Sequence, residues 1–360
     1  MIAALAAVRL TEVLRTARMR DASDVHLAPE TQPVLRIDGL LERLGTGVVC
    51  ASEIDRIAGA VLDAQALERL KATGDASTTH RDEEFGDCRV HAYRSSKGIV
   101  LAIRLLARTL PTLESLQLPA VVARLSERPK GLVLFTGPTG SGKSTALAAV
   151  IDRINRHKSR HILTIEDPIE YEHRSDLSIV SQREVGRDVP SFAVALKGAL
   201  RSDPDVILVG EMRDYETMHA ALAAAETGHL VFATLHTGEA AQTIDRVIGS
   251  FPPEAHEHVR IQLAQTLLGV LCLRLVPRSR GSGRRCAVEV LVANDAVGNV
   301  IREGKTHQLR NIIATGRNVG MQTLESHLSD LVMHHEVDLE VARQHALRPS
   351  EVRAFEPAAG

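Results

Sequence analysis

The apolar positions in the first third of the chain follow two spacings, one typical of helices and one typical of strands. Between residues 2 and 20, Leu5, Val8, Val13 and Leu14 are spaced for a single helix face. Along this part, the same reasoning predicts helices over 2–20 and 52–72 and strands over 22–27, 33–39, 88–94 and 99–105. Helices beside a small antiparallel sheet make an α+β domain, which closes at the breaker-rich stretch 107–112.

After about residue 118 the apolar side chains occur in unbroken runs, which are typical of strands buried on both faces. Such runs cover 131–136, 161–166, 205–210 and 230–235, and helical segments separate them. This alternation predicts a parallel, doubly wound α/β sheet. Residues 256–273 and 320–346 are predicted to be helical. The expected parts are an N-terminal domain over 1–108, a linker over 109–118, an α/β domain with C-terminal helices over 119–348 and a flexible tail over 349–360.

Composition narrows the class of protein. The 360 residues suffice for two domains, and a formal charge of −2 does not favour direct binding to nucleic acid. The four cysteines form no Cys-x-x-Cys pair, so neither a zinc ribbon nor a disulfide scaffold is expected. The sequence shows no secretory signal and no apolar segment of spanning length. These features favour a cytoplasmic protein whose membrane contact is peripheral.

A phosphate-binding loop is the most specific signal in the sequence. The stretch fits G-x-x-x-x-G-K-[ST] and lies between a buried strand and an alanine-rich helix, the context that the motif requires. Its glycines let successive N–H groups wrap an anion at the positive end of the helix. The chemistry predicts binding of ATP and Mg²⁺, with Lys143 on the phosphates and Ser144 on the metal. The loop comprises Gly137, Pro138, Thr139, Gly140, Ser141, Gly142, Lys143, Ser144 and Thr145.

Carboxylates follow two of the predicted strands, and ligands of open α/β sheets bind at the carboxyl ends of strands. Glu166 and Glu170 belong to the first group, and Glu211 ends the second. We expect Glu211 to order Mg²⁺ and water, and the sequence leaves open which carboxylate is the base. His229 precedes the next strand and His236 follows it, where His236 could sense the γ-phosphate.

Four segments in this order resemble the Walker A, Asp, Walker B and His boxes of the secretion and type IV pilus motor ATPases. They are the loop at 137–145, Thr164-Ile-Glu-Asp-Pro-Ile-Glu, Asp203-Pro-Asp-Val-Ile-Leu-Val-Gly-Glu-Met-Arg-Asp and Ala225-Glu-Thr-Gly-His-Leu-Val-Phe-Ala-Thr-Leu-His-Thr. Shorter segments, among them Ala22-Ser-Asp-Val-His-Leu, Ser181-Gln-Arg-Glu-Val and Gly320-Met-Gln-Thr-Leu, resemble the pilus-retraction (twitching motility) branch. The missing Cys-x-x-Cys pairs also favour that branch over the assembly and export branch.

The resemblance implies a PAS-like N-terminal domain, a RecA-like P-loop ATPase domain and a homohexameric ring, with ATP between the two domains. It implies that N-terminal arginines reach the phosphates; Arg89 and Arg104 match that region, and Arg94 is a further candidate. An inner-membrane pilus platform protein is the implied partner, at the inner face of the cytoplasmic membrane. The resemblance supports catalytic roles for Glu170, Glu211, His229 and His236. Glu166 is a further catalytic candidate from its position at a strand end.

One segment departs from the retraction branch. Where that branch typically has Ala-Ile-Arg-Asn-Leu-Ile-Arg-Glu, this chain has Ala296-Val-Gly-Asn-Val-Ile-Arg-Glu, with Gly298 in the place of an arginine. Glycine removes a charge and destabilises a helix by roughly 1 kcal/mol. The departure keeps one alternative open: an accessory subunit that binds ATP and assembles with a second motor ATPase. A related secretion or DNA-uptake motor is a further alternative, because it shares the ATP chemistry and differs only in cargo.

Overall fold

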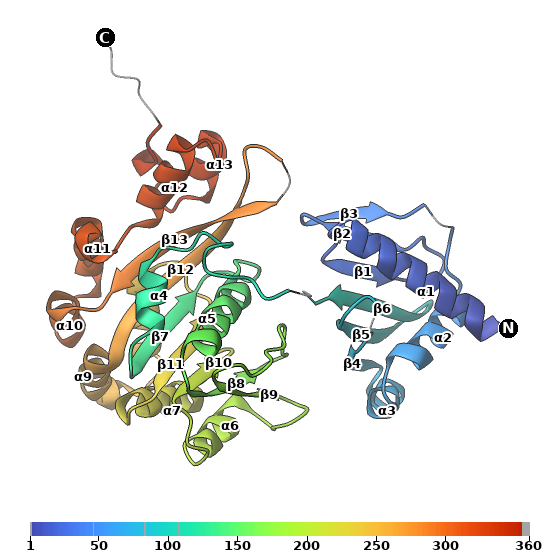
Figure 1. The fold of residues 1–360 in the computed structure, drawn as a ribbon, viewed down its shortest axis with the longest axis horizontal. Helices are drawn as coiled ribbons and strands as arrows, with labels where there is room; N and C mark the ends of the chain where they lie inside the picture. Colours follow the sequence, from blue (N-terminus) through green and yellow to red (C-terminus); the bar gives the residue numbers. More distant parts are fainter. Residues whose placement is uncertain (1, 46, 83, 107–108, 282, 355–360) are drawn as a thin grey trace, which may run out of the picture. The chain divides into compact units, whose positions relative to one another are not determined.

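The computed structural model describes residues 2–45, 47–82, 84–106, 109–281 and 283–354 (Figure 1). The chain divides into an N-terminal unit, Met1–Thr109, and a C-terminal unit, Leu110–Gly360. Each unit has its own sheet and its own apolar core.

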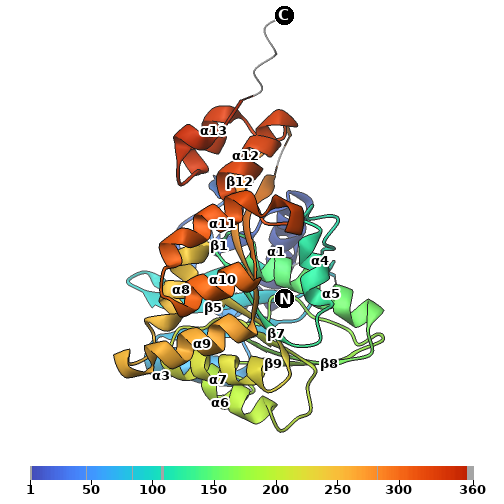
Figure 2. The ribbon, with the colours of Figure 1, turned by 90° about the vertical axis from the view of Figure 1, so that its left-hand side faces the viewer.

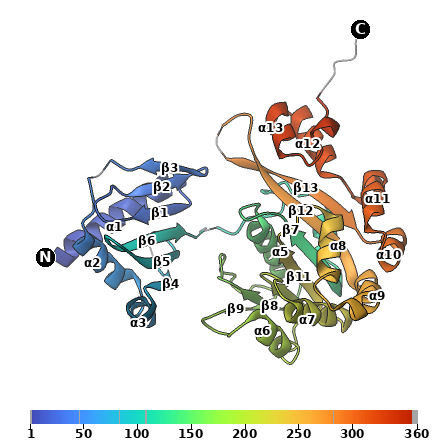
Figure 3. The same ribbon diagram turned by 180° about the vertical axis from the view of Figure 1, so that it is seen from behind.

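The N-terminal unit is an antiparallel sheet with helices on one face (Figure 3). Its strand order is β3-β2-β1-β6-β5-β4. The strands are β1 Asp24–Leu27, β2 Val34–Ile37, β3 Leu40–Arg43, β4 Asp75–His80, β5 Cys88–Ser95 and β6 Gly98–Leu105. The helices are α1 Ile2–Met19, α2 Ala51–Val61 and α3 Ala64–Thr73. Alternate strand residues such as Val25, Leu35, Val90 and Ile103 are buried beneath the helices, as period-two patterning requires.

Two features of this unit differ from the sequence-based prediction. The helix expected over 52–72 is two helices, because Asp63 starts a new one: its side chain accepts a hydrogen bond from the N–H of Ala66. Strands β3 and β4 were not predicted. All four residues of β3 are exposed and β4 is mostly polar, so neither strand carries the apolar alternation that identifies a strand in a sequence.

The C-terminal unit contains a seven-stranded sheet in the order β13-β12-β7-β11-β10-β8-β9. Every pairing is parallel except that of β12 with β13. The parallel sheet is therefore confirmed, with an antiparallel edge strand added. The strands are β7 Gly131–Thr136, β8 His161–Glu166, β9 Ile179–Glu184, β10 Val206–Val209, β11 Leu230–Leu235, β12 Leu267–Pro277 and β13 Arg284–Val292.

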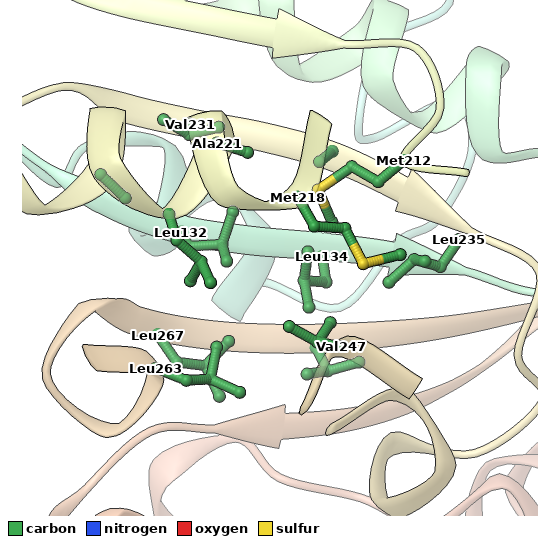
Figure 4. Close-up of a cluster of buried hydrophobic side chains, with 14 of the residues drawn as sticks. Leu132, Leu134, Met212, Met218, Ala221, Val231, Leu235, Val247, Leu263 and Leu267 are labelled. Atoms are coloured by element: carbon green, nitrogen blue, oxygen red, sulfur yellow. The ribbon is translucent and has the colours of Figure 1, made fainter. Parts of the chain in front are cut away.

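Helices cover both faces of this sheet (Figure 2). One core holds α4 and α5 against one face, and a larger core holds α6 to α11 against the other. In the larger core, Leu132 and Leu134 of β7 meet Met218 of α7 and Val247 of α8 (Figure 4). The helices are α4 Val121–Ser126, α5 Lys143–His157, α6 Phe192–Ala199, α7 Tyr215–Glu226, α8 Ala240–Ile248, α9 His256–Thr266, α10 Asp295–Arg302, α11 Leu309–Thr315, α12 Leu324–Met333 and α13 Leu339–His345.

The C-terminal third contains the largest errors of the sequence-based prediction. The helix expected over 256–273 ends at Thr266, and the apolar run that follows is strand β12, because a short apolar run alone does not distinguish helix from strand. The region 320–346 forms two helices, α12 and α13, separated by His335 in a left-handed conformation (φ 57°). In the expected tail, Val352 is buried with α12 and α13, and residues 355–360 lie outside the described part.

Candidate functional site

The carboxyl ends of four adjacent parallel strands lie at one edge of the C-terminal sheet. Val209 of β10 pairs with Ile165 of β8 on one side and Ala233 of β11 on the other. Leu235 of β11 pairs in turn with Thr136 of β7. The segments that follow these strands carry the phosphate-loop sequence, Glu166, Glu211 and His236, so the topology brings most of the predicted site to one edge.

The phosphate loop connects β7 to α5 and begins at Gly137, whose φ of 138° is unfavourable for other residues. A Cβ atom at Gly137 would collide with the carbonyl oxygen of Leu273 in β12, so the loop depends on glycine at this position. Gly142, at φ 93°, is the N-cap of α5 and leads into the first helical turn at Lys143. Ser141 Oγ is buried without a hydrogen-bond partner among the residues that the structure describes. This loop geometry fits an anion held by backbone N–H groups.

Lys143 folds back over the loop. Its Nζ donates to the carbonyl oxygens of Gly137 at 2.7 Å and Pro138 at 3.0 Å. Burial lowers the pKa of the Lys143 ammonium below its usual value, whereas the charges of Glu211 and Glu170 act in the opposite direction. Both carboxylates therefore lie within electrostatic reach of the lysine. The Ser144 side chain is exposed at the start of α5, while Thr145 Oγ1 lies 3.0 Å from the Tyr171 hydroxyl.

The backbone around Glu211 is fixed on both sides. The N–H of Gly210 donates to Ile165 O of β8 at 2.7 Å, and the N–H of Met212 donates to Thr234 O of β11 at 3.0 Å. These two bonds hold Glu211 at the strand edge, where its side chain is only 17 % exposed.

The Glu211 carboxylate has two cationic or potentially cationic partners. Its Oε1 lies 2.8 Å from Nε2 of His236 and its Oε2 lies 2.6 Å from a guanidinium nitrogen of Arg213. Burial alone would raise the pKa of Glu211, but the hydrogen bond and charge of Arg213, together with His236, bring the pKa below its usual value. Glu211 is therefore ionised at neutral pH, as a metal- or water-ordering carboxylate must be.

Glu166 ends the neighbouring strand β8 and has a different environment. Its Oε1 accepts hydrogen bonds from Thr164 Oγ1 at 2.7 Å and from Gln182 Nε2 at 3.1 Å. Burial raises the pKa of Glu166 despite these two bonds, and the nearby charge of Glu170 adds to the rise. Glu166 thus favours the neutral form more than Glu211 does. Glu170 lies in the segment between Glu166 and Tyr171.

The two predicted histidines lie at opposite ends of β11. His236 follows the strand and contacts Glu211, with a side chain that is 47 % exposed. His229 precedes the strand, and its Nδ1 lies 2.9 Å from the carbonyl oxygen of Ala224 in α7. A six-residue strand is about 20 Å long. Within this unit the structure therefore brings His236, but not His229, to the phosphate loop.

The predicted arginines belong to the N-terminal unit. Arg89 of β5 and Arg104 of β6 are directly paired across the two strands, so their side chains share one face of the sheet. Arg94 is five residues beyond Arg89 on the same strand and therefore points to the opposite face. Arg104 Nε donates to Asp24 Oδ1 at 2.9 Å.

Three contacting residues at these sites were missed by the sequence reasoning. Arg213 stands two residues after Glu211 in the quoted Walker B segment, which was a usable signal. Tyr171 follows Glu170 directly, yet its approach to Thr145 depends on the path of the loop after β8. Asp24 meets Arg104 through strand pairing across 80 positions of sequence, and no local pattern shows it.

Comparison with known proteins places this architecture in a family. The profile of the type II/IV secretion system proteins matches residues 3–355. The type IV pilus retraction ATPase PilT of Pseudomonas aeruginosa is 42 % identical over 340 residues, covering 94 % of this chain and 98 % of the relative. This chain belongs to the PilT family of secretion ATPases. It is accordingly an ATP-hydrolysing enzyme.

Other members of the PilT family match over nearly the whole length. A twitching motility protein of Neisseria gonorrhoeae is 40 % identical, covering 97 % of this chain and 93 % of its own. The crystal structure of the pilus retraction motor PilT with bound ADP matches with a TM-score of 0.87 at 42 % identity, over 94 % of this chain and 97 % of that one. Within the described residues, no helix combines the length and apolar character needed to cross a bilayer.

Proposed function

We propose that this PilT-family ATPase is a homohexameric motor that couples ATP hydrolysis to type IV pilus retraction, the movement underlying twitching motility. One observation carries the proposal: an ionised Glu211, held by Arg213 and His236, lies within electrostatic reach of Lys143 at a formed phosphate loop. The similarity to retraction motors over 94 % of the chain supports the choice of cargo.

ATP would bind with its phosphates in the loop from Gly137 to Thr145. Three features suit an anion: the left-handed glycines, the helix N-terminus, and the Ser141 hydroxyl, which has no hydrogen-bond partner in the described part of the chain. Lys143 would exchange its two carbonyl partners for phosphate oxygens. Ser144 and Glu211 are oxygen donors of the kind that Mg²⁺ prefers, and that ion would neutralise charge on the β- and γ-phosphates.

Hydrolysis requires an oriented water and stabilisation of the charge on the transferring phosphoryl group. Glu211 would orient the water or the metal, with Glu170 as a second carboxylate whose charge also acts on Lys143. His236, which shares a hydrogen bond with Glu211, would respond to the nucleotide state. Arg89 and Arg104 would supply positive charge to the phosphates. Glu166 would support the loop after β8, and His229 would support the start of β11.

The partners follow from the same proposal. An inner-membrane pilus platform protein would receive the motion, with the ring at the inner face of the cytoplasmic membrane and no direct contact with nucleic acid. A second motor ATPase is a further partner, because the type IV pilus ATPase PilU of P. aeruginosa is 36 % identical over 95 % of this chain and 90 % of its own.

An accessory role is the second candidate, and Gly298 favours it. Gly298 is buried in α10, and a Cβ atom there would lie 3.3 Å from a guanidinium nitrogen of Arg302 and 3.7 Å from Ala264 O of α9. Gly298 itself therefore presents no charged side chain at the position where the retraction branch carries an arginine. In this role the chain would bind ATP and add little turnover of its own.

The test is steady-state ATP hydrolysis by the purified chain, with the oligomer sized in the same buffer and Lys143→Ala as the matched phosphate-site variant. We expect turnover in a hexamer and its loss in the variant. Restored twitching in a host lacking its own retraction motor would establish the cargo. Binding of ATP without turnover, followed by turnover when a second motor is added, would favour the accessory role. Turnover without restored twitching would favour a secretion or DNA-uptake motor.

A further inference from the structure

The six-stranded sheet of the N-terminal unit has one apolar face and one polar face. The apolar face is covered by α1 and α2 through residues such as Leu14 and Ile57. On the other face the strand residues are mainly charged or hydroxyl-bearing, and they line up in rows because each is paired directly with the next strand. One of these rows crosses five neighbouring strands. It consists of Arg36 of β2, Asp24 of β1, Arg104 of β6, Arg89 of β5 and Thr79 of β4.

Asp24 is the only carboxylate in this row, and it is almost fully buried. Its side chain is 12 % exposed, whereas that of Arg104 is 55 % exposed. Oδ1 of Asp24 accepts from Arg104 Nε at 2.9 Å and Oδ2 accepts from Ser23 Oγ at 2.8 Å. Both oxygens are therefore engaged, and the carboxylate cannot turn toward another partner without losing a bond.

The contact uses one edge of the guanidinium and leaves the other free. Arg104 binds Asp24 through Nε, so the edge formed by its two terminal nitrogens is available to a second anion. A guanidinium edge of this kind matches two oxygens of a phosphate. The strand spacing of about 5 Å puts Arg89 beside it, and among the described residues Arg89 forms no hydrogen bond or ion pair.

Arg36, the other arginine next to Asp24, has a different partner from Arg104. It is paired with Asp24 on the other side, but its guanidinium donates to the carbonyl oxygen of Gly39 at 2.8 Å. His26 lies on the same face, and its pKa is lowered first by burial and then by the charges of Arg36 and Arg104, against the effect of Asp24. His26 is thus neutral at neutral pH. Of the two arginines paired with Asp24, only Arg104 forms an ion pair with its carboxylate.

We propose that Asp24 is a positioning residue that fixes the guanidinium of Arg104 for the phosphoryl oxygens of the bound nucleotide. The inference rests on the proposed function of Arg104 and adds the residue that makes this arginine rigid. A long side chain held at one edge loses less freedom when it meets the transition state, so Asp24 contributes to turnover through Arg104. Asp24 itself does not contact the nucleotide.

A double-mutant cycle on the full-length chain tests this. The variants are Asp24→Asn, Arg104→Gln and the two together, with kcat, KM for ATP and the melting temperature measured for each. Asp24→Asn should lower kcat by about tenfold to a hundredfold, as displaced catalytic groups do, with KM changed much less. In the Arg104→Gln background the same substitution should change kcat less than twofold. The matched control is Asp75→Asn, on the same face at the edge strand β4, where the carboxylate lies 3.5 Å from Nε2 of His91.

The outcomes distinguish the positioning role of Asp24 from the proposed function of Arg104. If Arg104→Gln abolishes turnover while Asp24→Asn leaves kcat unchanged, the positioning role is overturned and the proposed function stands. An equal loss from Asp24→Asn in both backgrounds, or a loss that follows the melting temperature, would also overturn it, because the carboxylate would then act on the fold. Full turnover in Arg104→Gln would instead remove the role of Arg104 in the proposed function, and the inference with it.

Discussion

The ends of strands β8 and β10 lie side by side in one sheet, and each carries a glutamate in a contrasting environment. Glu166 at the end of β8 accepts hydrogen bonds from neutral groups, those of Thr164 and Gln182, and burial raises its pKa. Glu211 after β10 has Arg213 and His236 as partners, which outweigh burial and lower its pKa. Position at a strand end brings a carboxylate to the site, but its burial and its neighbours decide in which direction its pKa moves.

The largest difference is expected when each of these two carboxylates is replaced, one at a time, by its neutral isostere. Glu211→Gln should lower kcat by about a thousandfold or more, the range found when a group that stabilises the transition state is removed. Glu166→Gln should lower kcat less than about tenfold, because glutamine resembles the protonated carboxyl that burial already favours. Steady-state kinetics on the two variants provides the comparison. Equal losses would show that both carboxylates act in their charged forms.

A third buried glutamate extends the comparison to stability. Glu289 of β13 accepts a hydrogen bond from the N–H of Ala240 at 2.8 Å, at the start of α8. Burial raises the pKa of Glu289 from 4.5 to about 7, opposed by the bond from Ala240; Glu239 and Glu325 add to the rise and Arg310 opposes it.

Since the pKa of Glu289 is higher in the folded chain, the folded state binds the extra proton between pH 4.5 and 7. The stabilisation is complete below pH 4.5 and is lost as the pH rises through 7. From pH 5 to 8 the wild-type chain should lose about 2–3 kcal/mol of unfolding free energy more than Glu289→Gln. Denaturant titrations at the two pH values measure this difference. Parallel curves for the two proteins would mean that Glu289 is charged throughout.

The sequence predicted the parts of this site that depend on local pattern. The buried strands, the phosphate loop and the strand-end position of Glu211 follow from apolar runs and a contiguous motif. The pKa shift of Glu166 does not follow from local pattern, because Gln182 reaches this glutamate from the neighbouring strand β9. For Glu211, the two-residue spacing to Arg213 is a local signal of the pair that lowers its pKa. The sequence wrongly predicts helix for strand β12 because its apolar run is buried on both faces and shows no strand period.

The third prediction changes the partner of Glu211 and leaves the carboxylate in place. Arg213→Gln removes the hydrogen bond and the charge that hold the pKa of Glu211 down, so burial, which acts in the other direction, should raise it. Because turnover requires the ionised carboxylate, the acid limb of the kcat profile should move to higher pH. Lys197→Gln is the control, since that lysine forms a solvent-exposed ion pair with Glu216 at 3.3 Å. An unmoved acid limb would mean that another group sets it.

The smallest effect is expected on the Glu166 side. Thr164→Val removes the hydroxyl that donates to Glu166 Oε1 at 2.7 Å and keeps the shape of the β8 side chain. The lost bond should cost about 1 kcal/mol of unfolding free energy, the usual net value of one hydrogen bond. It should also raise the pKa of Glu166 further, since that bond acts against the effect of burial. If Glu166 already works as a neutral group, kcat at neutral pH should stay within about twofold while stability falls. A kcat that falls steeply with Thr164→Val would show that turnover needs the charged form of Glu166, and the contrast between the two strand ends would then lie in their partners alone and not in their protonation.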